Sequence, residues 1–98
     1  LKVQKKDGRI QEFDLEKIER SIKPAYGKVE SQLIKSLATK VQRKILNKKS
    51  NPIKTIHIGK FILQELKKDD KMAYLRYATV YKGIEDPQIL EKEIQSMR

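Results

Sequence analysis

The sequence predicts an α+β fold, in which a small bundle of four or five helices carries a small sheet that begins as an N-terminal β-hairpin. Two observations predict it. An Asp-Gly pair lies within a short N-terminal segment of strand-like residues, which is a strong short-range hairpin signal. From residue 15 onward, apolar residues recur every three to four positions, which is typical of amphipathic helices. A length of 98 residues suits one small core, so we expect a single domain over 1–98.

The hairpin is expected to pair strands at about 1–6 and 9–13 around Asp7 and Gly8. A two-residue turn needs positive φ at both central residues, which Asp tolerates and Gly adopts freely. Neither face of such a hairpin is cleanly apolar, so the pattern defines its register only weakly. The expected register sets Val3 opposite Glu12 and Lys5 opposite Ile10.

Two helices are expected next. Asp14 is in position to cap a helix from Leu15 to Tyr26, and Pro24 is expected to kink or end that helix near residues 21–23. The clearest helix runs from Ser31 to Asn47. Its outer face is basic, which indicates either a solvated surface or a contact for a nucleic acid backbone. The basic residues of this face are Lys35, Lys40, Arg43 and Lys44.

A third strand and a third helix follow the loop 48–52. Ile53 and Lys54 are expected to form the short strand. Thr55 is expected to cap a helix that reaches about Lys67, because apolar residues repeat at helical spacing after it.

Two more helices are expected in the C-terminal part. Asp69 or Asp70 caps a helix from Met72 to Lys82, whose residues are apolar almost all round, so it is expected to be the buried central helix. Within it, Arg76 requires a polar partner such as Asp7, Asp14 or a phosphate. The last helix opens at Asp86-Pro87 and turns Leu90, Ile94 and Met97 inward.

Composition and motifs exclude several classes of protein. The chain has no cysteine, which excludes disulfides and a zinc ribbon within it, and no apolar run approaches the roughly 18 residues of a membrane span. We therefore expect a cytoplasmic protein that contacts no membrane. A Gly-rich phosphate loop and a nucleophile elbow are both absent, so we expect no catalytic residues and no enzyme. The single histidine, His57, is expected to be structural or exposed near a helix start, and no metal site is expected.

The basic residues point to an anionic ligand. The net charge is +10, from 23 Lys and Arg against 13 Asp and Glu, which attracts nucleotides, nucleic acids and acidic proteins. Lys5, Lys6 and Lys17 are expected to converge on the start of the first helix, beside the hairpin. Backbone N–H groups and the helix dipole favour an anion at such a place. The alternative is a solvated basic hairpin at the edge of a small domain.

Two separated segments carry a family resemblance. The first reads Val-Gln-Lys-Lys-Asp-Gly-Arg from Val3 and continues as Phe-Asp-Leu-Glu-Lys-Ile from Phe13. The second reads Met-Ala-Tyr-Leu-Arg-Tyr-Ala-Thr-Val-Tyr-Lys from Met72. Both resemble the ATP-cone domain, the regulatory nucleotide-binding module of many ribonucleotide reductases and of the bacterial repressor of their genes. The resemblance covers nearly all of the chain and implies a helical bundle capped by a three-stranded sheet.

The resemblance also implies a site for ATP or dATP, with Mg²⁺, between the hairpin, the first helix and the sheet. Val3 matches a position that packs on the base and bonds its edge through the backbone, and Phe13 and Ile18 match apolar positions around it. Gln11 stands where the family usually has Glu, and Lys6 stands where it usually has Arg, which loses a planar bidentate donor. At the phosphate and ribose end, the matching positions are Lys5, Lys6, Lys17, Thr55 and Lys82, and Asp14 caps the helix beside them.

Three functions remain open from the sequence. The first is a regulatory domain that binds ATP or dATP without hydrolysis and changes homo-oligomer assembly or contact with a partner. That partner would be a ribonucleotide reductase catalytic domain or DNA. The second is a small basic DNA- or RNA-binding protein, and the third is a degenerate cone that serves as an oligomerisation module. Saturable ATP binding that depends on Lys17 separates the first function from the others.

Overall fold

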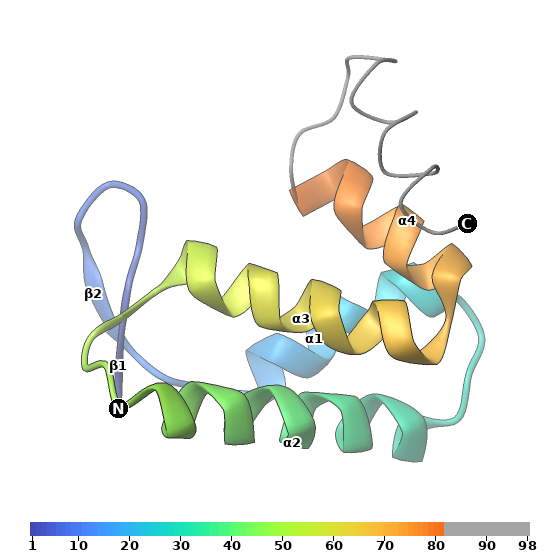
Figure 1. Ribbon diagram of the computed structural model, residues 1–98, viewed down its shortest axis with the longest axis horizontal. Helices are drawn as coiled ribbons and strands as arrows, with labels where there is room; N and C mark the ends of the chain where they lie inside the picture. Colours follow the sequence, from blue (N-terminus) through green and yellow to red (C-terminus); the bar gives the residue numbers. More distant parts are fainter. Residues whose placement is uncertain (82–98) are drawn as a thin grey trace.

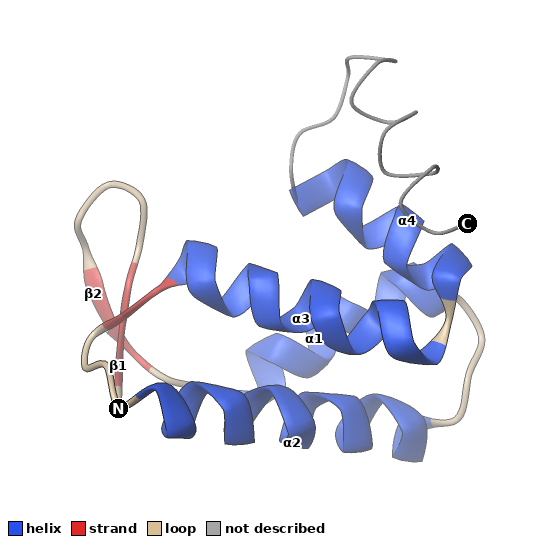
Figure 2. Cartoon of the chain, viewed as in Figure 1, coloured by secondary structure: helices blue, strands red, loops and turns tan. Residues whose placement is uncertain are grey.

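The computed structural model describes residues 1–81. Within these residues, four helices form a bundle and three short strands gather at one end of it, so the predicted α+β fold is confirmed (Figure 2). The helix expected from Asp86 and the end of the preceding helix at Lys82 lie outside the described residues. The elements are β1 (Lys2–Gln4), β2 (Ile10–Glu12), α1 (Leu15–Tyr26), α2 (Ser31–Lys48), β3 (Ile53–Lys54), α3 (Thr55–Asp69) and α4 (Lys71–Tyr81).

The sheet has the strand order β2-β1-β3, with β1 in the middle. β1 pairs antiparallel with β2 and parallel with β3. Val3 is therefore flanked by Gln11 on one side and by Ile53 on the other. Parallel strands need a long crossover connection, and here α1 and α2 supply it. The third strand predicted at Ile53 and Lys54 is confirmed.

The hairpin turn differs from the expected two-residue turn. The Lys5 N–H donates to the Arg9 carbonyl (2.8 Å) and the Gly8 N–H donates to the Lys5 carbonyl (3.0 Å), so three residues form the loop. Gly8 alone in this loop has a positive φ, of 90°. The extra loop residue shifts the register by one, so the predicted pairs Val3–Glu12 and Lys5–Ile10 are wrong. Because opposed residues share a face, Val3 and Gln11 now point to the same side of the sheet.

α1 has the predicted bounds, Leu15 to Tyr26, and Pro24 does not end it. The Asp14 side chain accepts a hydrogen bond from the Glu16 N–H (3.0 Å), which confirms its role as the N-terminal cap. The helix continues through Pro24 to Tyr26, so of the two effects expected of Pro24, an end near residues 21–23 does not occur. Ile22 and Ala25 are both buried, and their packing holds the last turn although Pro24 removes one backbone hydrogen bond.

The two helices of the C-terminal part are capped differently from each other. Thr55 is the first residue of α3 rather than its cap, and the cap position belongs to Lys54, whose side chain makes no capping bond. That prediction is wrong because Lys54 is still paired with β1, so the strand leads directly into the helix. Asp70 caps α4 as predicted, since its carboxylate accepts from the N–H groups of Met72 (2.9 Å) and Ala73 (3.2 Å).

The described helices pack as a ring, in which α1 and α3 each contact both α2 and α4, and Figure 1 shows α3 between α2 and α4. α4 buries Ala73, Tyr74 and Ala78 but leaves Met72 and Val80 exposed, the latter to 82%. The prediction that it is buried almost all round is therefore wrong, because within residues 1–81 it packs against α1 and α3 and leaves other side chains exposed. Arg76 is exposed and donates to the Ala25 carbonyl at the end of α1 (3.1 Å), and no carboxylate within residues 1–81 pairs with it. None of the helices within residues 1–81 is long and apolar enough to span a membrane.

Two leucines of α2 differ in burial, so we expect their substitutions to have very different effects on stability. Leu37 is 2% exposed and Leu46 is 57% exposed. Leu37→Ala is expected to lower the free energy of unfolding by about 2–5 kcal/mol, because it leaves a cavity in a packed core. Leu46→Ala is expected to change it by less than about 0.5 kcal/mol. Urea denaturation followed by circular dichroism measures both, and equal losses would contradict the burial of Leu37.

A side chain at Gly8 is expected to destabilise the fold through its backbone conformation and not through a steric clash. A Cβ added there would meet no heavy atom within 4 Å, so only its positive φ opposes a side chain. Gly8→Ala is expected to destabilise the fold by roughly 1–2 kcal/mol and Gly8→Asn by less, because Asn adopts this backbone region more readily. The same urea titration measures both variants. An Ala variant as stable as the parent would rule out this turn.

Candidate functional site

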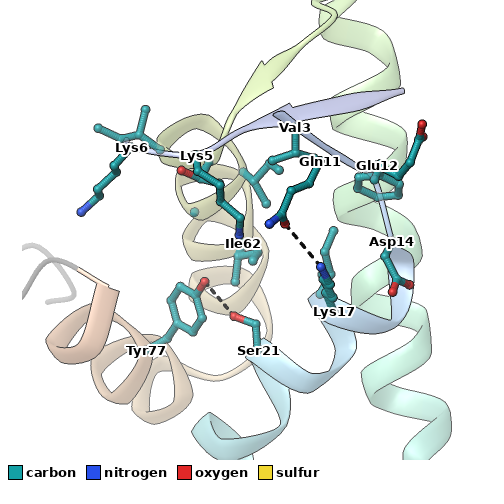
Figure 3. A pocket seen from close by; sticks show the side chains of 16 residues that line it. Val3, Lys5, Lys6, Gln11, Glu12, Asp14, Lys17, Ser21, Ile62 and Tyr77 are labelled. Atoms are coloured by element: carbon teal, nitrogen blue, oxygen red, sulfur yellow. Dashed lines mark hydrogen bonds between the residues drawn. The ribbon is translucent and has the colours of Figure 1, made fainter. Parts of the chain in front are cut away.

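A pocket of about 280 Å³ lies between the hairpin, α1 and the start of α3 (Figure 3). Its size is close to the lower end of the range for small-molecule sites, about 300–1,000 Å³. Nine of the ten residues predicted from the resemblance line it, and the tenth, Lys82, lies outside the described residues. The nine are Val3, Lys5, Lys6, Gln11, Phe13, Asp14, Lys17, Ile18 and Thr55.

The observed hairpin register explains how strand residues reach this pocket. Alternate residues of β1 and β2 point to the same side, so Val3 and Gln11 face the helices together. The Phe13 N–H donates to the Leu1 carbonyl (2.9 Å), which extends the same pairing to the end of the hairpin. In the register predicted from the sequence, Val3 and Gln11 would have pointed to opposite faces, and the site would have been divided.

The floor of the pocket is apolar and rigid. Val3, Ile18 and Ile62 line it and are 8%, 5% and 2% exposed. They belong to the hydrophobic core, and the partly buried Phe13 and Ile58 pack against that core beside them. Such a floor suits a flat apolar group, because it removes apolar surface from water without any rearrangement of the protein.

The rim of the pocket is basic. Lys5, Lys6 and Lys17 line it from the hairpin and α1. The Lys17 ammonium donates to the Gln11 amide oxygen (3.4 Å), a neutral partner that leaves its charge uncancelled (Figure 3). Within residues 1–81, the side chains of Lys5 and Lys6 form no ion pair. The rim therefore attracts an anion.

The two carboxylates beside the pocket are engaged elsewhere. Glu12 accepts a hydrogen bond from the Lys2 ammonium, and this bond lowers the pKa of Glu12 below its ordinary value. Asp14 caps α1 and also lies 3.8 Å from the Arg20 guanidinium. Neither carboxylate neutralises the three rim lysines, so the positive charge of the rim is available to a ligand.

The first turn of α3 contributes a further positive element. Thr55 and Ile56 line the pocket from this turn, where the helix dipole places its positive end. His57 follows them but does not line the pocket, and it is partly exposed near the helix start, as expected. Partial burial and the nearby Lys48, Lys60 and Lys54 lower the pKa of His57, so it is mainly neutral at pH 7.

The sequence matches the ATP cone domain family over residues 1–87. The chain belongs to the ATP-cone domain family. Among its relatives, the transcriptional repressor NrdR of Acidovorax sp. (strain JS42) is 44% identical over 86 residues, which cover 86% of this chain and 58% of that protein. NrdR of Leptothrix cholodnii is 36% identical over 97% of this chain and 66% of its own length. NrdR of Lactococcus lactis subsp. cremoris is 36% identical over 99% and 67%, respectively. The chain thus spans about three fifths to two thirds of these relatives.

Sequence reasoning missed part of the pocket of this ATP cone. Ser21 lines it, and its hydroxyl lies 3.1 Å from that of Tyr77 on α4 (Figure 3). The helical spacing of Ser21 from Lys17, one turn along the same face, is a signal that could have identified it. Tyr77 and Ile62 carry no such signal, since only the packing of α3 and α4 against α1 brings them to the pocket.

The described part of this cone offers no site of its own for a metal ion. No group of three or more His, Cys, Asp or Glu within residues 1–81 is placed to hold one. Mg²⁺ prefers several oxygen ligands and often takes them from substrate phosphates and water. An Mg²⁺ ion at the pocket would therefore depend on the phosphates of a nucleotide.

Proposed function

We propose that this ATP-cone domain binds ATP or dATP in the pocket between the hairpin, α1 and α3. One observation carries the proposal: the hairpin and α1, with the distant α3 packed beside them, bring an apolar floor and a rim of three lysines to the same cavity. An adenine ring and a triphosphate need these two environments side by side. Membership of the ATP-cone family supports the same assignment.

We assign the ends of the nucleotide by the chemistry of the lining. The base packs on Val3, Phe13 and Ile18, where the floor is apolar. Gln11 bonds the base or the ribose through its amide, which brings no charge. At the other end, the rim lysines and Thr55 hold the phosphates beside the first turn of α3. Lys82 remains a prediction for the same end.

The proposed domain senses the nucleotide and does not hydrolyse it. Hydrolysis would need a base that orients water at the terminal phosphate. Glu12 and Asp14 are the carboxylates that line the pocket, and Lys2, Arg20 and the N-terminus of α1 already engage them. Mg²⁺ would arrive with the nucleotide.

Binding becomes regulation only if the nucleotide prefers one state of the protein over another. We propose that this state is an assembly of several copies, or a contact with a partner. Relatives named transcriptional repressors favour control of gene expression over contact with a ribonucleotide reductase catalytic domain. The regulated genes would then be those of ribonucleotide reductase, and the protein would act in the cytoplasm.

Isothermal titration calorimetry tests the nucleotide site. ATP and dATP, each with Mg²⁺, are expected to bind saturably, and GTP much more weakly, at near-physiological salt. Lys17→Ala is expected to weaken ATP binding by about 10- to 100-fold, the usual loss for one charge-assisted hydrogen bond. Lys23→Ala is the matched control, because it removes the same charge from the same helix at a residue that does not line the pocket.

Two results would overturn the proposal. One is a folded chain that binds no adenine nucleotide. The other is an equal loss of affinity in both lysine variants, which would mean that general charge rather than the pocket holds the ligand. Size-exclusion chromatography with light scattering, with and without nucleotide, then tests whether occupancy changes the assembly.

A further inference from the structure

Positive charge is unevenly distributed along the chain. Residues 31–68 contain ten Lys and Arg and one Glu, a net charge of +9 out of +10 for all 98 residues. This segment forms α2, β3 and most of α3. α2 and α3 pack side by side, and in Figure 1 they lie in front of α1. The excess charge therefore belongs to one part of the fold.

The one carboxylate of this segment, Glu65, pairs with two of its ten basic residues and leaves a large excess of positive charge. Glu65 is 7% exposed and lies 3.0 Å from the Lys44 ammonium and 3.8 Å from that of Lys68. Lys44 also donates to the Gln64 amide oxygen (2.9 Å). The contacts of Lys44 join α2 to α3, and they bring Lys44 of α2 and Lys68 of α3 to the same carboxylate.

A second group of lysines surrounds His57 at the other end of α3. Lys48 ends α2, Lys54 ends β3 and Lys60 lies in α3, and all three act on His57. Their side chains are exposed, as is that of Lys68. Within residues 1–81, Lys48, Lys54 and Lys60 form no ion pair. We call the whole set the α2–α3 basic face: Lys44, Lys48, Lys54, Lys60 and Lys68.

We propose that the α2–α3 basic face binds the phosphate backbone of duplex DNA. The face follows α3 from Lys54 to Lys68, about 21 Å at 1.5 Å per residue, a length over which duplex DNA carries about 12 phosphates. Lysine is depleted in the cores of protein–protein interfaces, which disfavours an acidic protein as the partner. Lysine contacts position a protein on DNA without reading its sequence, so this face supplies affinity and register.

This face is separate from the nucleotide pocket. None of its five lysines lines that pocket. DNA binding and nucleotide binding can therefore be removed by different substitutions, and either assignment can fail without the other.

Fluorescence anisotropy of the 98-residue chain with a labelled 30-base-pair duplex, from 50 to 200 mM NaCl, tests the proposal. The variant is Lys48→Gln with Lys60→Gln, and the control is Lys23→Gln with Lys28→Gln, which removes the same charge at exposed positions outside the face. In the variant, the slope of log K against log salt is expected to fall by about 1.8, and affinity at 100 mM by tenfold or more. The control is expected to keep most of the parent's slope and affinity.

Several outcomes would overturn the proposal. One is that the parent chain does not bind the duplex at 50 mM NaCl. Another is that the variant and the control lose the same affinity for the duplex. Tighter binding of single-stranded DNA or of polyglutamate than of the duplex would assign the face to another partner. Circular dichroism checks that both variants fold. Lys17→Ala is expected to keep duplex binding while it loses ATP binding, which separates failure of this proposal from failure of the nucleotide site.

The pKa of His57 can report whether DNA lies beside Lys48, Lys54 and Lys60. It is the only histidine of the chain, so its ring-proton resonance in NMR is assigned without ambiguity. The pKa of His57 is expected to lie below 6.5 in the parent, to rise in the Lys48 and Lys60 variant, and to rise when duplex DNA neutralises the surrounding lysines. A pKa that does not change with saturating duplex would overturn the placement of DNA at this end of the face.

Discussion

The pairing of β1 with both of its neighbours is the interaction on which the rest of the structure depends. Val3 is hydrogen-bonded into a sheet between Gln11 and Ile53, and its side chain is buried beneath that sheet. The parallel pair requires the chain to travel through α1 and α2 before β3 can form. β3 then leads directly into α3, so the start of α3 is placed beside the hairpin. The pocket exists because these two pairings occur on the same strand.

This small domain has two basic surfaces, the rim of the pocket and the α2–α3 basic face, and their lysines have different neighbours. Lys17 lies beside an apolar floor and a helix start, in a cavity that suits a ligand with one apolar end and one anionic end. The lysines of the α2–α3 basic face instead lie on the outside of two packed helices, joined by the contacts of Lys44 with Gln64 and Glu65. The same residue type is thus suited to a mononucleotide in one place and to an extended polyanion in the other.

α4 contributes Tyr77 to the lining of the pocket. Tyr77 and Ser21 bring their hydroxyl groups to 3.1 Å in the pocket wall, and Arg76 bonds the carbonyl of Ala25 at the end of α1. These contacts couple α4 to the helix that carries Lys17. A nucleotide that changes the position of α1 would therefore act on α4 as well, which gives the proposed sensor a physical route to a surface outside the pocket.

The sequence by itself determined the local features of this protein, and packing decided the rest. The spacing of Ile34, Leu37, Val41 and Ile45 was sufficient for α2, and Asp14 and Asp70 were recognisable as caps, because these signals act within a few residues. The family resemblance named nine residues that line one pocket, but their meeting there depends on the hairpin register. The three-residue loop of the hairpin decided that register, and tertiary structure decided the passage of α1 through Pro24, the loss of the cap at Thr55 and the exposure of Met72 and Val80 on α4. The register depends on the hydrogen bonds of the hairpin loop, and the other features depend on contacts between segments far apart in the chain, which local propensity does not contain.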